Sequence, residues 1–143
     1  DFNDSVKARF GTGNDLEIFH DGSNGIIKQD ALTGLEIMAD NFRLQNSAGT
    51  ETMIAADGDG AVSLYHDDTL MVSTSSNGLH FADNKKLTFG DASSPDFEIY
   101  HNGSQTIVDD KGTGSLEFRS NAFSVASAGG AASMLLATAI MED

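Results

Sequence analysis

The chain has 143 residues, which suits one domain or a short run of repeats and is too short for a multi-domain enzyme. Eight basic residues against 22 acidic ones give a net charge of −14, which repels phosphate backbones and anionic lipids, so nucleic acids and membrane surfaces are poor candidates as partners. The absence of cysteine excludes disulfides, iron–sulfur clusters, thiolate zinc sites and cysteine catalysis.

Short β-strands are predicted from the first residues onward. In residues 16–20, LEIFH, Leu16, Ile18 and His20 share one face, and Glu17 and Phe19 share the other. The same period of two follows at eight further pairs: Leu35/Ile37, Phe42/Leu44, Val62/Leu64, Leu70/Val72, Leu79/Phe81, Leu87/Phe89, Leu116/Phe118 and Phe123/Val125. Only the alanine-rich residues 131–141 could be helical, and their similarity to the first copy of an internal repeat favours a strand there too.

Tight turns are predicted between these strands. Asp-Gly or Asn-Gly pairs occur at residues 21–22, 24–25, 57–58, 59–60, 77–78 and 102–103. We expect each pair to supply the positive φ that a tight hairpin turn requires. Short strands with a turn every 8–12 residues or so are typical of all-β proteins, so we expect an all-β fold of short antiparallel strands.

The chain resembles itself at an offset of 81 residues. Residues 15–23, DLEIFHDGS, recur as residues 96–104, DFEIYHNGS. Upstream of these runs the offset becomes 79, which aligns Lys7 with Lys86. Such internal similarity indicates a repeat architecture.

Two β-repeats follow from this alignment. We expect the first over residues 4–82 and a second, incomplete one over residues 83–143, without a counterpart of residues 60–67. Because self-contained repeat proteins finish with capping units, we interpret the chain as a segment of a longer protein or as an end built into a larger assembly.

Catalytic templates are absent from the sequence. It has no Gly-x-Ser-x-Gly elbow and no phosphate loop ending in Gly-Lys-Ser/Thr. The carboxylate pairs Glu17/Glu36 and Glu98/Glu117 could flank a glycosidic bond if they lay about 5–10 Å apart. Both pairs recur in the repeat, however, and this favours a structural role. We therefore expect no enzymatic activity and no cofactor.

Two glycine-rich turns imitate ligand loops. Residues 57–60, DGDG, are similar to the start of a calcium loop, but the sequence lacks the glutamate of the twelfth position. Residues 11–15, GTGND, imitate a phosphate loop, but they precede a predicted strand and not a helix. We interpret both as ordinary turns.

Histidine is the one chemically suggestive residue type. His20, His66 and His101 each follow an aromatic residue and precede Asp or Asn and a turn. We expect them to be strand-end residues, bonded to the following Asp or Asn or to the turn backbone. In a threefold assembly, His20 and His101 could instead meet their own copies at the axis and bind a transition metal such as zinc.

Two runs of sequence carry a family resemblance. Residues 6–24, VKARFGTGNDLEIFHDGSN, and residues 53–68, MIAADGDGAVSLYHDD, are similar to repeats in virion structural proteins and tail fibres of tailed bacteriophages, above all those of cyanophages and other marine phages. In those repeats the second run leads into a Thr-Thr/Ser-x-Gly segment, which residues 73–78 resemble here. His66 departs from the pattern, because a second aromatic residue is more usual at that position.

The resemblance implies a non-enzymatic structural module of a phage virion appendage, located in the virion as a tail fibre or related fibre. It also implies an elongated, fibre-like architecture, completed by a parallel homotrimer in contact with other virion proteins. Exposed strand edges and a thin core fit this expectation, because neighbouring copies would cover both. The alternative is an adhesion module that attaches to host-surface glycans.

Overall fold

The computed structural model describes residues 1–30 and 34–126. Within these residues the protein is all-β, with eleven strands, antiparallel pairing throughout and no helix. This confirms the expected fold class and the antiparallel strands. In the same part of the chain, no helix has the length and hydropathy needed to cross a membrane.

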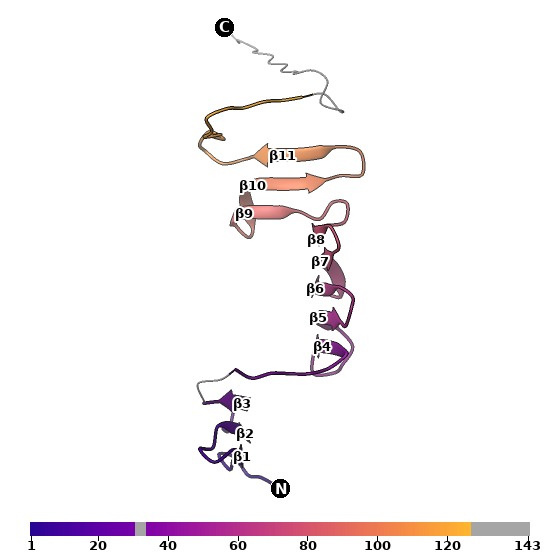
Figure 1. The fold of residues 1–143 in the computed structure, drawn as a ribbon. Helices are drawn as coiled ribbons and strands as arrows, with labels where there is room; N and C mark the ends of the chain where they lie inside the picture. The colour runs from indigo at the N-terminus through magenta and orange to yellow at the C-terminus, as the bar shows by residue number, and fades with distance from the viewer. Residues whose placement is uncertain (31–33, 127–143) are drawn as a thin grey trace. The chain divides into compact units, whose positions relative to one another are not determined.

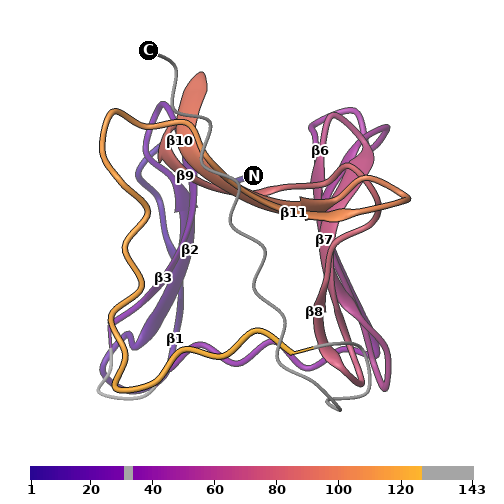
Figure 2. The ribbon, with the colours of Figure 1, turned by 90° about the horizontal axis from the view of Figure 1, so that it is seen from above.

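The first sheet contains β1 (Ala8–Phe10), β2 (Leu16–His20) and β3 (Gly25–Gln29) in that order, and its strands lie side by side (Figures 1 and 2). The central strand pairs on both sides, with Ile18 opposite Ala8 and opposite Ile27. Two hairpin connections thus place one alternating row of apolar side chains on a single face.

The second sheet is a five-stranded meander in which each strand pairs with the next. It contains β4 (Asn41–Gln45), β5 (Thr52–Asp57), β6 (Val62–His66), β7 (Thr69–Ser75) and β8 (Gly78–His80). The register shifts once between β4 and β5 and once between β6 and β7. These irregularities are bulges, which locally increase the twist of a sheet.

The third sheet contains β9 (Leu87–Asp91), β10 (Ser94–His101) and β11 (Thr106–Asp110), with β10 in the middle. Its strand order is that of the first sheet, since in both a central strand pairs with a preceding and a following strand. The only proline of the chain, Pro95, lies at the start of β10 beside a register shift. Proline is tolerated there because the ladder is already interrupted.

Three of the predicted turn glycines have a positive φ, namely Gly22, Gly78 and Gly103. The prediction is wrong for the pairs at residues 24–25 and 57–58, in which neither residue has a positive φ, and it holds for the pair at residues 59–60, although not at the glycine. In the turn at residues 57–60, Asp59 takes the left-handed conformation instead, with a φ of 56°. Gly58 is needed for space, because a Cβ atom there would lie 2.8 Å from the carbonyl oxygen of Asp40.

Three predicted strands do not form among the described residues: Leu35/Ile37, Leu116/Phe118 and Phe123/Val125. The alternation of side chains is present, but a strand exists only when a neighbouring strand takes up its backbone groups. No described strand does so for these segments. The helix or strand considered for residues 131–141 lies outside the described residues.

The chain divides into two compact units, Asp1–His80 and Phe81–Asp143. The first unit holds the first two sheets, and the second unit holds the third. The assignment of residues 4–82 and 83–143 as β-repeats stays a prediction.

Burial is limited to very few side chains. Among the described residues, only Ala55, Glu17 and Glu98 are buried, with exposed fractions of 5%, 7% and 4%. Two of these three are charged, and no large apolar side chain is buried. The single chain therefore leaves its alternating apolar rows in contact with solvent.

Candidate functional site

All three sheets carry apolar residues on one face that is exposed, and we call these the open faces. In the first sheet, the strand register places Phe10 beside Leu16, and Ile18 beside Ile27, on one face. Phe10 exposes 52% of its surface and Ile27 exposes 60%. Large contiguous apolar surfaces of this kind mark interaction sites in soluble proteins.

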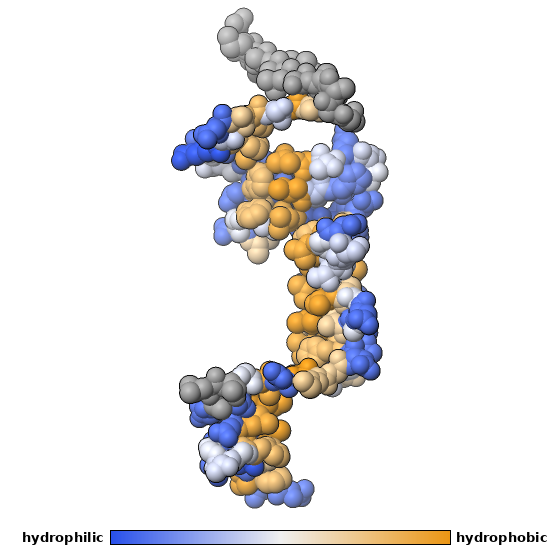
Figure 3. Space-filling view, viewed as in Figure 1, coloured by the Kyte–Doolittle hydropathy of each residue, from blue (hydrophilic) through white to orange (hydrophobic). Residues whose placement is uncertain are grey.

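The open face of the second sheet is the largest. One row across four strands consists of Leu44, Ile54, Leu64 and Val72, and a second row begins with Phe42. Figure 3 shows hydrophobic residues along one side of β4–β8 and hydrophilic residues along the other. The two faces of the sheet thus have opposite character, as the alternation of the sequence requires.

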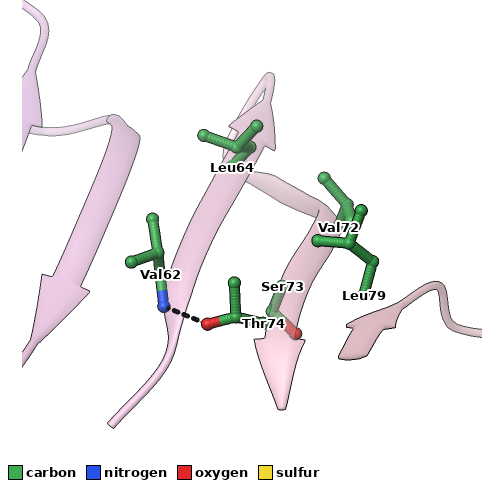
Figure 4. A pocket seen from close by; sticks show the side chains of 6 residues that line it. All are labelled: Val62, Leu64, Val72, Ser73, Thr74 and Leu79. Atoms are coloured by element: carbon green, nitrogen blue, oxygen red, sulfur yellow. Dashed lines mark hydrogen bonds between the residues drawn. The ribbon is translucent and has the colours of Figure 1, made fainter. Parts of the chain in front are cut away.

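A shallow hollow of about 230 Å³ lies on β6, β7 and β8 (Figure 4). Its lining consists of Val62, Leu64, Val72, Ser73, Thr74 and Leu79. The Thr74 hydroxyl oxygen already accepts a 2.8 Å hydrogen bond from the Val62 amide. The hollow is lined mainly by aliphatic side chains, so it suits an apolar side chain better than a sugar, whose hydroxyls need polar partners.

In the third sheet the open face repeats the arrangement of the first. Leu87, Ile99 and Val108 form one row across all three strands. Phe89 and Phe97 form the next, with ring centroids 5.7 Å apart at a tilted angle. Tilted ring pairs at this separation attract one another, so part of this face is already ordered in the single chain.

The reverse face of the first sheet is built around the Glu17 carboxylate. Lys7 Nζ lies 2.7 Å from its Oε2 atom, and Arg9 Nε lies 3.0 Å from its Oε1 atom. The Lys7 ammonium also lies 4.5 Å from the ring centroid of Phe19, a cation–π contact. Hydrogen bonds from Lys7 and then Arg9 lower the pKa of Glu17, so this buried carboxylate stays charged.

The reverse face of the third sheet holds Glu98 in the same way. Lys86 and Lys111 each place an Nζ atom 2.8 Å from its Oε2 atom. The Lys86 ammonium lies 4.6 Å from the ring centroid of Tyr100. The two hydrogen bonds, first that of Lys111, lower the pKa of Glu98, while the bond to Glu98 raises the pKa of Lys111.

These ion clusters do not suit acid catalysis. A glycosidase acid needs a raised pKa in order to hold a proton near neutral pH, whereas the pKa values of Glu17 and Glu98 are lowered. Glu117 is bound by Arg119 at 2.8 Å. Within the described residues, no polar contact joins Glu17 to Glu36 or Glu98 to Glu117.

Each of the two candidate metal-binding histidines has an aspartate partner. The Nδ1 atom of His20 lies 2.8 Å from Oδ1 of Asp4, and that of His101 lies 2.9 Å from Oδ1 of Asp83. With a proton on Nδ1 the ring donates to the carboxylate, and without one the same atom accepts from the backbone amide of Gly22 or Gly103, 3.1 Å away, so the tautomer decides which bond forms.

The sequence prediction for these histidines is corrected in one respect. The carboxylate comes from Asp4, which precedes the sheet, and not from the adjacent Asp21. Asp21 instead accepts bonds from the backbone amides of residues 23 and 24, which lower its pKa. The other predicted partner, the turn backbone, is confirmed, since the Gly22 amide lies within hydrogen-bond distance of Nδ1 of His20, at 3.1 Å, and the Gly103 amide lies at the same distance from Nδ1 of His101. His66 ends β6 and is exposed.

No group of three or more possible metal ligands occurs within the described residues. A single chain places one imidazole at the last residue of β2 and one at the last residue of β10, so a site made by His20 or His101 would require several copies. The threefold metal site therefore stays a prediction.

The glycine-rich turns hold their own side chains. Arg43 lies 2.9 Å from Oδ1 of Asp57, so the carboxylate that begins the turn at residues 57–60 already has a cation partner. In the turn at residues 11–15, the Asp15 carboxylate packs directly against Gly11 and Gly13. A negative side chain in this position repels a phosphate group.

Comparisons of the chain with protein-family models, with curated proteins and with solved structures gave no match.

Sequence reasoning missed the partners of the charged residues, although a signal for them exists. The offset of 79 that aligns Lys7 with Lys86 also aligns Asp4 with Asp83. In the structure, Lys7 and Lys86 each bind a glutamate, and Asp4 and Asp83 each contact a histidine. Extending the alignment three residues upstream would have pointed to Asp4.

Proposed function

We propose that this chain is a non-enzymatic structural module of a phage virion appendage, a tail fibre or a related fibre, built from repeating β-units and working as a homotrimer. The observation that carries this proposal is the open face present on every sheet. An enzyme or a self-contained domain buries its large apolar residues, and this chain buries none of them among its described residues.

The repeating unit is supported by matching contacts. The first and third sheets share their strand order, the doubly bonded buried glutamate, the lysine above an aromatic ring and the aspartate–histidine pair. A catalytic site is seldom duplicated within one chain, whereas a structural repeat duplicates every contact. This duplication supports the proposal that the chain is a structural repeat unit of an appendage.

Further copies of the same chain are the natural cover for the open faces. The reverse faces are charged, and the chain as a whole carries −14. If copies meet through their open faces, the apolar rows are buried and the acidic surplus stays in water, where repulsion is weakest. The number three rests on the resemblance to phage fibre repeats, which also supplies the location in the virion and the contacts with other virion proteins.

The function is tested on the virus particle that carries the chain. Antibodies raised against the chain should label a fibre or another appendage in immuno-electron micrographs of intact particles. Label confined to infected cells and absent from particles would contradict the proposal.

Attachment to host-surface glycans is an alternative with its own readout. Saturable binding of the isolated chain on a glycan array would replace the structural role with an adhesive one. The proposal predicts that no sugar binds above background.

A further inference from the structure

Two corresponding segments of the chain have the side-chain pattern of a strand but no strand partner. They are residues 34–39, GLEIMA, and residues 115–120, SLEFRS, and we call them the linking segments. The offset between them is the 81 residues of the repeat. Within the described residues, neither segment belongs to a sheet, and no backbone–backbone hydrogen bond to either is present.

The linking segments are apolar on alternate positions and exposed. Leu35 and Ile37 expose 48% and 66% of their surfaces, and Leu116 and Phe118 are similarly exposed. Between β3 and β4, the first segment runs as a lone extended trace in Figure 1. Surface loops of this length are normally polar and turn-rich, whereas this pattern fits a half-buried strand.

We propose that each linking segment becomes a β-strand by pairing with neighbouring copies of this chain. In this arrangement residues 34–39 lie between β3 of one copy and β4 of another, and residues 115–120 lie against β11 of a neighbour. The inference rests on the proposed homo-oligomer and specifies how its copies are joined: by backbone ladders in addition to the open faces.

The free edges of the described strands balance in this arrangement. β3 ends the order of the first sheet and β4 begins that of the second, so each has one unpaired edge. The segment between them offers two edges. When the segment lies between β3 of one copy and β4 of another, each of its two edges pairs with the free edge of one of these strands. In a closed ring of copies, the free edges of β3, β4 and the segment are then all paired.

The lengths of the three elements agree. Six extended residues span about 20 Å, and the five residues of β3 or of β4 span about 17 Å. Residues 34–39 can therefore cover each of these strands along its whole length.

Side-chain chemistry also fits the placement of residues 34–39. If Leu35 and Ile37 extend the open face, alternation puts Glu36 on the reverse face. The reverse faces of the flanking strands carry Lys28 on β3 and Arg43 on β4, opposite in charge to Glu36. Opposite charges on neighbouring strands stabilise their pairing, and like charges would oppose it.

Disulfide trapping tests the arrangement, and the absence of cysteine makes the chain suitable for it. One chain carries Glu36→Cys, and a second chain of different mass carries Lys28→Cys or Ile26→Cys. After co-expression and mild oxidation, we expect a covalent pair of the two different chains. Neighbouring strands lie about 4.8 Å apart, within the range of about 4.4–6.8 Å between Cα atoms that a disulfide bridges.

A matched control places the first cysteine at Ser47, in the turn between β4 and β5, and should give no such pair. Trimers that form normally but yield no Glu36→Cys bridge with either β3 position would overturn this inference and leave the proposed function standing. A monomeric mass by light scattering would overturn both.

Amide hydrogen exchange on the unmodified protein is the second measurement, in case a cysteine variant does not assemble. Amides of residues 34–39 should exchange at least about tenfold more slowly in the assembled protein than in a diluted, dissociated sample, because ladder hydrogen bonds must open first. Equal, fast exchange in both samples would show a solvent-exposed loop and contradict the inference.

Discussion

The Nδ1 atom of His20 lies 2.8 Å from the Oδ1 atom of Asp4, and this contact ties the segment before β1 to the end of β2. The Ser5 amide adds a 2.7 Å hydrogen bond to the His20 carbonyl oxygen. In the third sheet the Asn84 amide donates the equivalent 2.7 Å bond to His101. In each three-stranded sheet, one imidazole–carboxylate contact and one backbone hydrogen bond thus join the segment before the first strand to the end of the central strand, and we call this pair of contacts the latch.

Removal of the latch carboxylate should have a small effect on stability. We expect Asp83→Ala to lower the free energy of unfolding by less than about 1 kcal/mol, because both partners are largely exposed and solvent screens the pair. Urea denaturation measures the loss, and amide exchange at Asn84 should become faster. A loss above about 2 kcal/mol, or unchanged exchange at Asn84, would contradict the latch.

The Glu98 carboxylate should matter more for stability than the carboxylate of its less buried neighbour Asp109. Glu98→Gln removes the charge that Lys86 and Lys111 share, and leaves two ammonium groups facing each other across a buried amide. Asp109→Asn on the same reverse face is the matched control, since Asp109 is only half-buried and makes only a 3.5 Å contact with Lys111. The midpoint temperature of thermal unfolding should be clearly lower for Glu98→Gln than for Asp109→Asn. The opposite order would contradict a stabilising role of the ion cluster.

The same cluster predicts loss of stability in acid. The pKa values of Glu17 and Glu98 are lowered in the folded protein from an ordinary value of 4.5, so the unfolded chain binds protons first. Their contribution is therefore present above pH 4.5 and is lost as the pH falls from there through the lowered folded-state pKa.

Urea midpoints at a series of pH values measure this dependence. The double variant Glu17→Gln/Glu98→Gln should be less stable than the natural protein at pH 7, and the difference should shrink below pH 4.5. A difference that stays constant with pH would show that the loss comes from packing and not from charge.

Gly90 should tolerate no side chain. Its φ is +97°, and a Cβ atom would lie 2.9 Å from the Asp96 amide nitrogen and closer still to the Asp96 carboxylate. We expect Gly90→Ala to lower the free energy of unfolding by at least about 1–2 kcal/mol, the cost of a left-handed conformation in alanine. Gly114→Ala, where nothing lies within 4 Å, is the control and should be nearly neutral.

The fold class was accessible from the sequence because alternation and turn residues are local signals. The pattern of residues 16–20 predicts β2, and the Asn-Gly pair at residues 102–103 predicts the turn after β10, since neither depends on distant contacts. The same alternation predicts strands in residues 34–39, which do not form among the described residues. The side-chain pattern predicts which residues favour a strand. It does not predict which neighbouring strand would accept and donate the backbone hydrogen bonds that a strand requires.

The candidate site was accessible only in part. Alternation shows that Ile18 and Glu17 point to opposite faces, but not that Glu17 is the buried one. That outcome depends on Lys7, which precedes β1 and contacts both the Glu17 carboxylate and the Phe19 ring of β2. The partner of His20 escaped prediction because it lies sixteen residues upstream, beyond a Ser5 residue with a φ of 67°.

The most direct test of the account is the mass of the chain in solution, measured by light scattering at several concentrations. Burial of the open faces between copies predicts three times 15.1 kDa, about 45 kDa. Val108→Ser, on the open face, should shift this mass downward at low concentration, whereas Asp109→Ser on the reverse face of the same strand should not. A concentration-independent mass of 15.1 kDa, with the circular-dichroism spectrum of intact β-structure, would contradict the account.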